Sequence, residues 1–254
     1  MNHPALPIDH VHACLIGRLW QPELGATLVA ITAEHVFDLS ALAATSSQLL
    51  DLARPATQVR QCIANGQAPA LARTDDVLKN ADEAKRNDTQ PWLMAPCDLQ
   101  AIKAAGVTFV ASMLERVIEE QARGDASKAE AVRQAVVAVI GDNLRSVKPG
   151  SPESAKLKEV LLAQGMWSQY LEVGIGPDAE IFTKSQPMSA VGTGAMAGIH
   201  PGSQWNNPEP EVVLAVNSRG EVVGATLGND VNLRDFEGRS ALLLGKAKDN
   251  NASC

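Results

Sequence analysis

Two short apolar runs near the C-terminal end, EVVLAV and EVVGATL, most constrain the fold of this chain. They span residues 211–216 and 221–227, and the turn sequence Ser218-Arg219-Gly220 lies between them. Short runs rich in β-branched residues and joined by such a turn are typical of a β-hairpin. An antiparallel hairpin returns the chain to its starting level. The residues that follow the second run should therefore lie beside those that precede the first.

The N-terminal part predicts a small α+β domain over residues 1–73. Three apolar runs that predict strands span 14–20, 26–32 and 35–40. Residues 45–54 predict a helix that opens at Thr45 and cannot run through Pro55, and a second short helix should follow. The polar and charged segment 74–97 predicts a linker or a surface excursion.

Residues 98–254 are expected to form a second domain that begins with helices. Apolar residues at three- and four-residue spacings predict helices over 98–123, 127–140 and 152–169. Gly106 can interrupt the first of these, which would then begin near Ala111. After Val173 short apolar runs replace the helical period and indicate a β-sandwich or a rolled sheet. The fold class is therefore α+β, with a β-rich C-terminal part.

The composition excludes several functional classes. The net charge is −7 and the basic residues never form a run, so the sequence predicts no nucleic-acid partner. No stretch is apolar enough to span a membrane, and the N-terminus lacks the pattern of a signal peptide. The 4 cysteines are far apart, which fits neither a disulfide framework nor a zinc site. These features predict a soluble, cytoplasmic protein with no membrane partner.

Three carboxylates flank the predicted hairpin and suggest a metal site. Glu209 and Glu211 lie at the start of the first strand, where residues i and i+2 point to the same side. Two such anions repel unless a cation lies between them, and a hard divalent ion suits an all-oxygen site. The hairpin should return Asp230 to the same place. Taken separately, the glutamates are also compatible with a solvated strand end, and Gly228-Asn229-Asp230 with a turn.

Two lysines and one histidine near these carboxylates leave alternatives open. Lys246 and Lys248 follow an apolar segment, where either can act as a base or a positive clamp, or simply provide surface charge. His200 precedes the glutamates in sequence, where it can contact a substrate or serve the structure. Sequence patterns alone do not decide between these roles.

Residues 180–254 resemble the fumarylacetoacetate hydrolase superfamily in four motifs. The motifs are EIFTK, WNNPEPE, GNDVNLRDFEG and KAKDNNASC, and their order and separation agree with the family. GRLWQPE and GVTFVASMLER extend the resemblance more loosely toward the N-terminus. It is strongest to the branch that dehydrates 2-keto-3-deoxy sugar acids. The resemblance implies a rolled mixed β-sheet in the C-terminal domain. It also implies further residues after Cys254, so this domain is expected to be incomplete.

The resemblance further implies a set of functional residues. The metal would be Mg²⁺, with Mn²⁺ or Ca²⁺ as alternatives, and its ligands would be Glu209, Glu211 and Asp230. Catalytic residues would be Glu180, Lys248 and Glu115, with Lys248 matching the family lysine better than Lys246. Lys184 and Arg234 would contact the substrate.

The activity implied is removal of water from a 2-keto-3-deoxy sugar acid, such as 2-keto-3-deoxypentonate, to give a 2,5-dioxo acid. The alternative within the superfamily is a metal-dependent C–C bond hydrolase that acts on a 2,4-diketo or acylpyruvate-type acid. The hydrolase branch activates water with a His or Glu near the position of Glu115, and the lack of a histidine there favours the dehydratase. A non-catalytic domain that keeps the fold is a third possibility. The resemblance also implies a homodimer.

Overall fold

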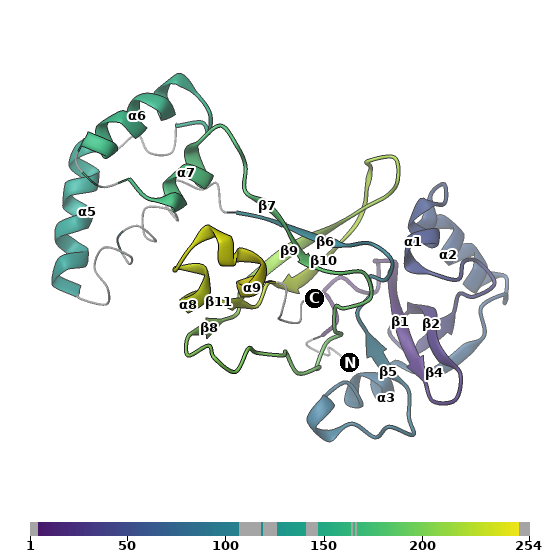
Figure 1. Ribbon diagram of the computed structural model, residues 1–254. Coiled ribbons are helices and arrows are strands. Elements are labelled where there is room, and N and C mark those ends of the chain that lie inside the picture. Colours follow the sequence, from purple (N-terminus) through teal and green to yellow (C-terminus); the bar gives the residue numbers. More distant parts are fainter. Residues whose placement is uncertain are drawn as a thin grey trace. The chain divides into compact units, whose positions relative to one another are not determined.

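The computed structural model describes residues 5–106, 118, 126–140, 147–163, 165 and 167–248 (Figure 1). These residues combine helices with antiparallel sheets. The chain divides into two compact units, one formed by Met1–Ile102 with Thr183–Cys254 and the other by Lys103–Phe182. The domain boundaries predicted from the sequence stay a prediction.

A five-stranded antiparallel sheet forms the N-terminal part of the first unit, in the order β4-β3-β2-β1-β5. The three strands predicted from apolar runs are confirmed as β1 (Leu15–Gln21), β2 (Gly25–Ile31) and β3 (His35–Asp38). The edge strands are β4 (Ala70–Arg73) and β5 (Trp92–Met94). The segment 74–97 contains α3 (Thr74–Lys79), η1 (Glu83–Lys85) and β5. Trp92 of β5 stacks on Trp20 of β1, with ring centroids 5.7 Å apart.

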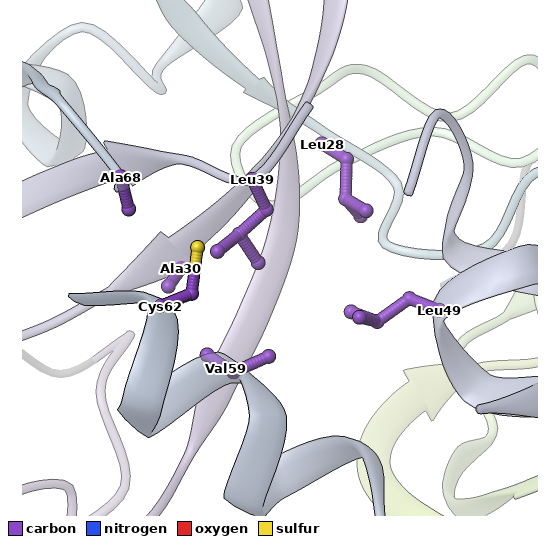
Figure 2. Close-up of a cluster of buried hydrophobic side chains, with 7 residues drawn as sticks. All are labelled: Leu28, Ala30, Leu39, Leu49, Val59, Cys62 and Ala68. Atoms are coloured by element: carbon purple, nitrogen blue, oxygen red, sulfur yellow. The ribbon is translucent and has the colours of Figure 1, made fainter. Parts of the chain in front are cut away.

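Both faces of this sheet bury apolar side chains. On one face, Leu28 and Ala30 of β2 belong to a cluster with residues of α1 (Ser46–Asp51) and α2 (Pro55–Ala64) (Figure 2). The members of this cluster are Leu28, Ala30, Leu39, Leu49, Val59, Cys62 and Ala68. Val29 packs in a second cluster with Val77 of α3. Because side chains alternate along a strand, burial on both faces explains why β2 is a continuous apolar run.

The first of the two N-terminal helices begins as the sequence predicts, and the second begins at Pro55. The Thr45 hydroxyl accepts a hydrogen bond from the Gln48 N–H at 3.1 Å, which satisfies one of the donors left over at a helix start. Pro55 occupies the first position of α2, where its missing N–H has no helical partner to lose.

Asp98 ties several of these elements together through one buried carboxylate. Its oxygens accept hydrogen bonds from the backbone N–H groups of Ser46 and Ser47 and from the Ser47 hydroxyl, at 2.7, 3.2 and 2.6 Å. Arg18 Nε lies 3.9 Å from the carboxylate. The Asp98 carbonyl accepts from Met188 N at 2.9 Å. Burial raises the pKa of Asp98, but these hydrogen bonds outweigh it and hold the pKa below its usual value.

The predicted C-terminal hairpin is confirmed by β9 (Pro210–Val216) and β10 (Val222–Asn229). Their antiparallel register pairs Gly228 with Glu211. The tip of the hairpin is tied to the end of α1. The Ser218 N–H donates to the Asp51 carboxylate at 2.8 Å, and the Arg219 guanidinium donates to the Asp51 carbonyl at 3.0 Å. The tip of the hairpin is therefore held by α1.

Short elements flank this hairpin. A two-stranded antiparallel sheet pairs β8 (Asn206–Asn207) with β11 (Asn232–Leu233). After it come α8 (Arg234–Glu237), η3 (Ala241–Leu243) and α9 (Leu244–Lys248). Another two-stranded sheet consists of β6 (Ile102–Ala105) and β7 (Ile181–Ser185). The helix predicted over 98–123 is therefore wrong at residues 102–105, where pairing with β7 outweighs local helix propensity.

The second unit contains α5 (Ala126–Ile140), α6 (Pro152–Ala163) and α7 (Gln169–Ile175). The helix predicted over 127–140 is confirmed. The helix predicted over 152–169 ends early, because Gly165 adopts a φ of 67° and the Ser168 side chain caps a new helix at the Leu171 N–H. Among the described residues, no helix combines the length and the apolar character needed to cross a membrane.

Replacing Asp98 with asparagine should lower the free energy of unfolding by about 2 kcal/mol at neutral pH, because charge-assisted hydrogen bonds are lost at a buried site. The folded-state pKa is depressed, so this contribution is present above the unfolded pKa and is lost as the pH falls through the folded pKa. Urea unfolding at several pH values measures it. The exposed Asp88→Asn change is the matched control, with no effect expected. A D98N deficit that stays constant down to acid pH would contradict the assignment.

Candidate metal centre

The structure brings Glu209, Glu211 and Asp230 together. Each offers one carboxylate oxygen to a group whose atoms all lie within 4.8 Å of one another. The register of the hairpin explains this, since Glu211 of β9 pairs with Gly228 of β10 and Asp230 follows directly after β10. The Asp230 N–H also donates to the Glu209 carbonyl at 2.9 Å. The position predicted for Asp230 from the hairpin pattern is the position observed.

The three carboxylates differ in exposure. The side chain of Asp230 is 6% exposed and that of Glu209 15% exposed, while Glu211 is the most exposed of the three. Burial raises the pKa of Glu211, and the negative charges of Asp230 and Glu209 raise it further. Such a rise is the expected result of crowding like charges, and a bound cation would relieve it.

Lys248 places its ammonium directly against this cluster. Its Nζ lies 2.6 Å from Glu209 Oε2 and 3.0 Å from Asp230 Oδ2. Burial alone would lower the pKa of Lys248, but the charges of Glu209 and Asp230 outweigh it and hold the pKa above its usual value. Lys246 is exposed, and its Nζ lies over the Phe236 ring, 5.0 Å from the centroid. Of the two lysines left open by the sequence, the structure brings Lys248 to the carboxylates.

Lys184 supports the cluster from β7. Its side chain is 1% exposed, and its Nζ donates to the backbone carbonyls of Val231 and Lys248, at 2.9 and 2.5 Å. The same nitrogen lies 3.4 Å from Asp230 Oδ1. Burial lowers the pKa of Lys184, although the Asp230 charge opposes this effect. Lys184 thus fixes the backbone next to Asp230 and the end of the helix that carries Lys248.

The donor set fits a hard divalent cation. All three groups that converge are carboxylates, which Mg²⁺, Mn²⁺ and Ca²⁺ prefer as ligands. Two ammonium groups, those of Lys184 and Lys248, offset part of the charge of three carboxylates, and the remaining charge is negative. Asp230 Oδ1 is buried and accepts no hydrogen bond from any described residue. The Lys184 ammonium lies 3.4 Å from this oxygen, and a bound divalent cation would give the oxygen a further partner.

Arg234 lies in a polar network beside this cluster that sequence reasoning did not foresee. Its Nη1 donates to Glu237 Oε2 at 3.0 Å. Asn232 Nδ2 donates to the same oxygen at 2.6 Å and to Glu209 Oε1 at 3.2 Å. Asn232 and Glu237 lie in the motif GNDVNLRDFEG that contains Asp230. Both are polar residues among apolar neighbours, and this contrast was the signal that the sequence offered.

His200 has a structural role among the alternatives that the sequence left open. Its ring packs edge-on against Phe236 with centroids 5.2 Å apart, and its Nδ1 accepts from the Gly202 N–H at 3.0 Å. Neither contact involves a carboxylate of the cluster.

The other two predicted catalytic residues are Glu180 and Glu115. Glu180 belongs to the second unit, where its backbone carbonyl accepts from the Gly106 N–H at 2.9 Å. Glu115 lies outside the described residues. Their predicted roles stay predictions.

Comparison with known proteins points to one group of enzymes. The chain is 29% identical over 227 residues to a probable 2-keto-3-deoxyxylonate dehydratase from Haloferax volcanii, a match that covers 89% of this chain and 61% of that protein. It is 38% identical over 69 residues to a 2-dehydro-3-deoxy-D-arabinonate dehydratase from Saccharolobus solfataricus, which covers 27% of this chain and 23% of that protein. No protein-family model matches the chain.

Solved structures show a similar fold. The apo form of 2-keto-3-deoxy-D-arabinonate dehydratase matches with a TM-score of 0.54 and 18% identity, over 94% of this chain and 64% of that one. The form of the same enzyme complexed with magnesium and 2,5-dioxopentanoate matches with a TM-score of 0.53, 18% identity and the same coverage. This chain therefore spans less than two thirds of the length of the proteins that it resembles.

Replacing Lys248 with methionine should destabilise the metal-free protein, because Glu209 and Asp230 lose the cation between them. The loss should be about 3 kcal/mol, the usual cost of removing one partner of a buried ion pair. Added Mg²⁺ should raise the melting temperature of K248M more than that of the unchanged protein, since it restores positive charge. Thermal unfolding with and without Mg²⁺ measures both effects. The exposed Lys246→Met change is the control, and an equal response in K246M would refute the assignment.

Proposed function

We propose that this protein is a metal-dependent dehydratase that removes water from a 2-keto-3-deoxy sugar acid, such as 2-keto-3-deoxypentonate, to give a 2,5-dioxo acid. The observation that carries the proposal is the convergence of Glu209, Glu211 and Asp230 against the buried ammonium of Lys248. The similarity to 2-keto-3-deoxy sugar acid dehydratases supports the same activity. The resemblance of the motifs supports membership of the fumarylacetoacetate hydrolase superfamily.

Glu209, Glu211 and Asp230 would hold Mg²⁺, or Mn²⁺ or Ca²⁺ in its place. When bound, the cation supplies positive charge that stabilises the negative charge developing on the oxygens of a 2-keto acid. The three side chains differ in exposure, with Asp230 buried and Glu211 more exposed.

Removal of water breaks the C3–H bond and the C4–O bond and gives a 2-keto-3-enoic acid. This acid becomes the 2,5-dioxo acid when protons leave C5 and its hydroxyl and are returned to C3 and C4. Groups that accept protons and groups that deliver them are therefore required. We assign these tasks to Lys248 and Glu180. The Lys248 ammonium contacts two of the proposed ligands, which puts it within reach of a keto acid held at the same site. The assignment of Glu180, and of Glu115 as a further acid or base, rests on the motif resemblance.

Two basic residues are proposed to act on the substrate or its surroundings. Arg234 would contact the substrate carboxylate while Glu237 holds its guanidinium at 3.0 Å. Lys184 is proposed from the resemblance as a substrate contact, yet its burial and its two backbone carbonyl partners favour an indirect contribution through Asp230.

The proposal extends to the setting in which the enzyme works. It includes a rolled mixed sheet and a homodimer, which the resemblance implies. It also includes a cytoplasmic location, which the cysteine content indicates. Light scattering on the purified protein measures the oligomeric state.

The decisive experiment incubates the protein with a panel of 2-keto-3-deoxy acids and Mg²⁺ and follows the products by mass spectrometry. Loss of one water is expected, and activity should disappear with EDTA and return with Mg²⁺ or Mn²⁺. Glu209→Gln should lower kcat/KM by about 100-fold or more, because one charged metal ligand is lost. The matched control is Glu221→Gln, at the exposed tip of the same hairpin, which should leave activity unchanged.

Each other outcome counts against the proposal in a specific way. Turnover that persists in chelator would exclude a role for the metal. Two carbon fragments in place of a dehydrated product would identify the C–C bond hydrolase instead. The absence of both turnover and metal-dependent binding of pyruvate would support a non-catalytic domain.

A further inference from the structure

We propose that Asn232 is a positioning residue of the metal centre, whose side-chain amide orients the Glu209 carboxylate and separates it from Glu237. The inference rests on the proposed function, since it takes Glu209 to be a metal ligand.

The backbone places Asn232 between two of the proposed ligands. It begins β11, two residues after Asp230, and pairs with Asn207 of β8, which lies two residues before Glu209. The residue is fully buried, with 0% exposure. The position of its side chain is therefore fixed relative to both Asp230 and Glu209.

The side-chain amide bridges two carboxylates. Asn232 Nδ2 donates to Glu209 Oε1 at 3.2 Å and to Glu237 Oε2 at 2.6 Å. A primary amide nitrogen has two hydrogens, so both are engaged. With Oε1 bound in this way, the other oxygen of Glu209 faces Lys248 Nζ at 2.6 Å. Asn232 thus fixes the orientation of the Glu209 carboxylate.

The charges around Asn232 explain why a hydrogen-bond donor is required there. Glu209 belongs to the carboxylate cluster, and Glu237 adds another negative charge on the far side of the same amide. Arg234 neutralises Glu237 in part, at 3.0 Å. Without the amide, the Glu209 carboxylate would keep its contact with Lys248 but would lose the donor to Oε1 that separates it from Glu237.

A buried polar atom without a hydrogen-bond partner supports a functional role for Asn232. Asn232 Oδ1 is buried and has no hydrogen-bond partner among the described residues. Buried acceptors are normally satisfied, and exceptions call for an explanation. The orientation that directs the NH₂ group at both carboxylates necessarily turns Oδ1 away from them, which accounts for the exception.

The test measures Mn²⁺ binding to the metal-free full-length chain from the electron paramagnetic resonance signal of free Mn²⁺. Asn232→Ala should weaken Mn²⁺ binding by about 10- to 100-fold, the usual effect of removing a group that orients a metal ligand. Asn206→Ala, an exposed asparagine in β8 of the same small sheet, is the matched control and should bind as the unchanged protein does.

A double-mutant cycle with Glu237→Gln separates positioning from a general structural role. In the E237Q background, the loss caused by N232A should be smaller, because the repulsion that Asn232 offsets is reduced. Asn232→Ser keeps a single donor and should give an intermediate loss, which also serves if N232A does not fold. Unchanged Mn²⁺ binding in N232A or N232S, or an equal loss in N206A, would overturn the inference. Failure of the unchanged protein to bind Mn²⁺ would overturn the proposed function, and this inference with it.

Discussion

Mutual repulsion of three carboxylates is the constraint on which the C-terminal part of this protein depends. Glu209, Glu211 and Asp230 are brought within 4.8 Å of one another by the register of a hairpin, and such a cluster is unfavourable without compensation. The chain provides two buried ammonium groups, Lys184 and Lys248, one from β7 and one from the end of α9. Charge therefore links elements that are distant in sequence.

The two lysines divide this task. Lys184 is buried and donates to the backbone carbonyls of Val231 and Lys248, so its main effect is to fix the backbone at these two residues. Lys248 meets the carboxylate oxygens themselves, where a divalent cation would also bind. A group that competes with the cation for the same oxygens must be able to move or to change its partners when the cation binds. A group that holds backbone does not face this requirement, which explains why Lys184 is suited to the interior.

Much of this centre could be predicted, because its main determinant is local. Strand alternation and a tight turn are legible in a sequence, and together they were sufficient to place Asp230 beside Glu209. The choice between Lys246 and Lys248 required the three-dimensional structure, in which Lys246 contacts Phe236 and Lys248 contacts the carboxylates. The role of Asn232 depends on a contact with Glu237 that no spacing rule encodes. Likewise, β6 was mistaken for helix because its partner β7 lies far away in sequence.

The two ends of the hairpin make contacts of different chemistry, and only the base carries the carboxylates. At its tip, Asp51 accepts hydrogen bonds from Ser218 and Arg219, which joins the hairpin to α1. The other end of α1 is held by the Asp98 carboxylate. The N-terminal part thus holds the tip through α1, while the base carries the three carboxylates together with the Lys248 ammonium and the Asn232 amide. The base is accordingly the end of the hairpin at which a bound cation would act.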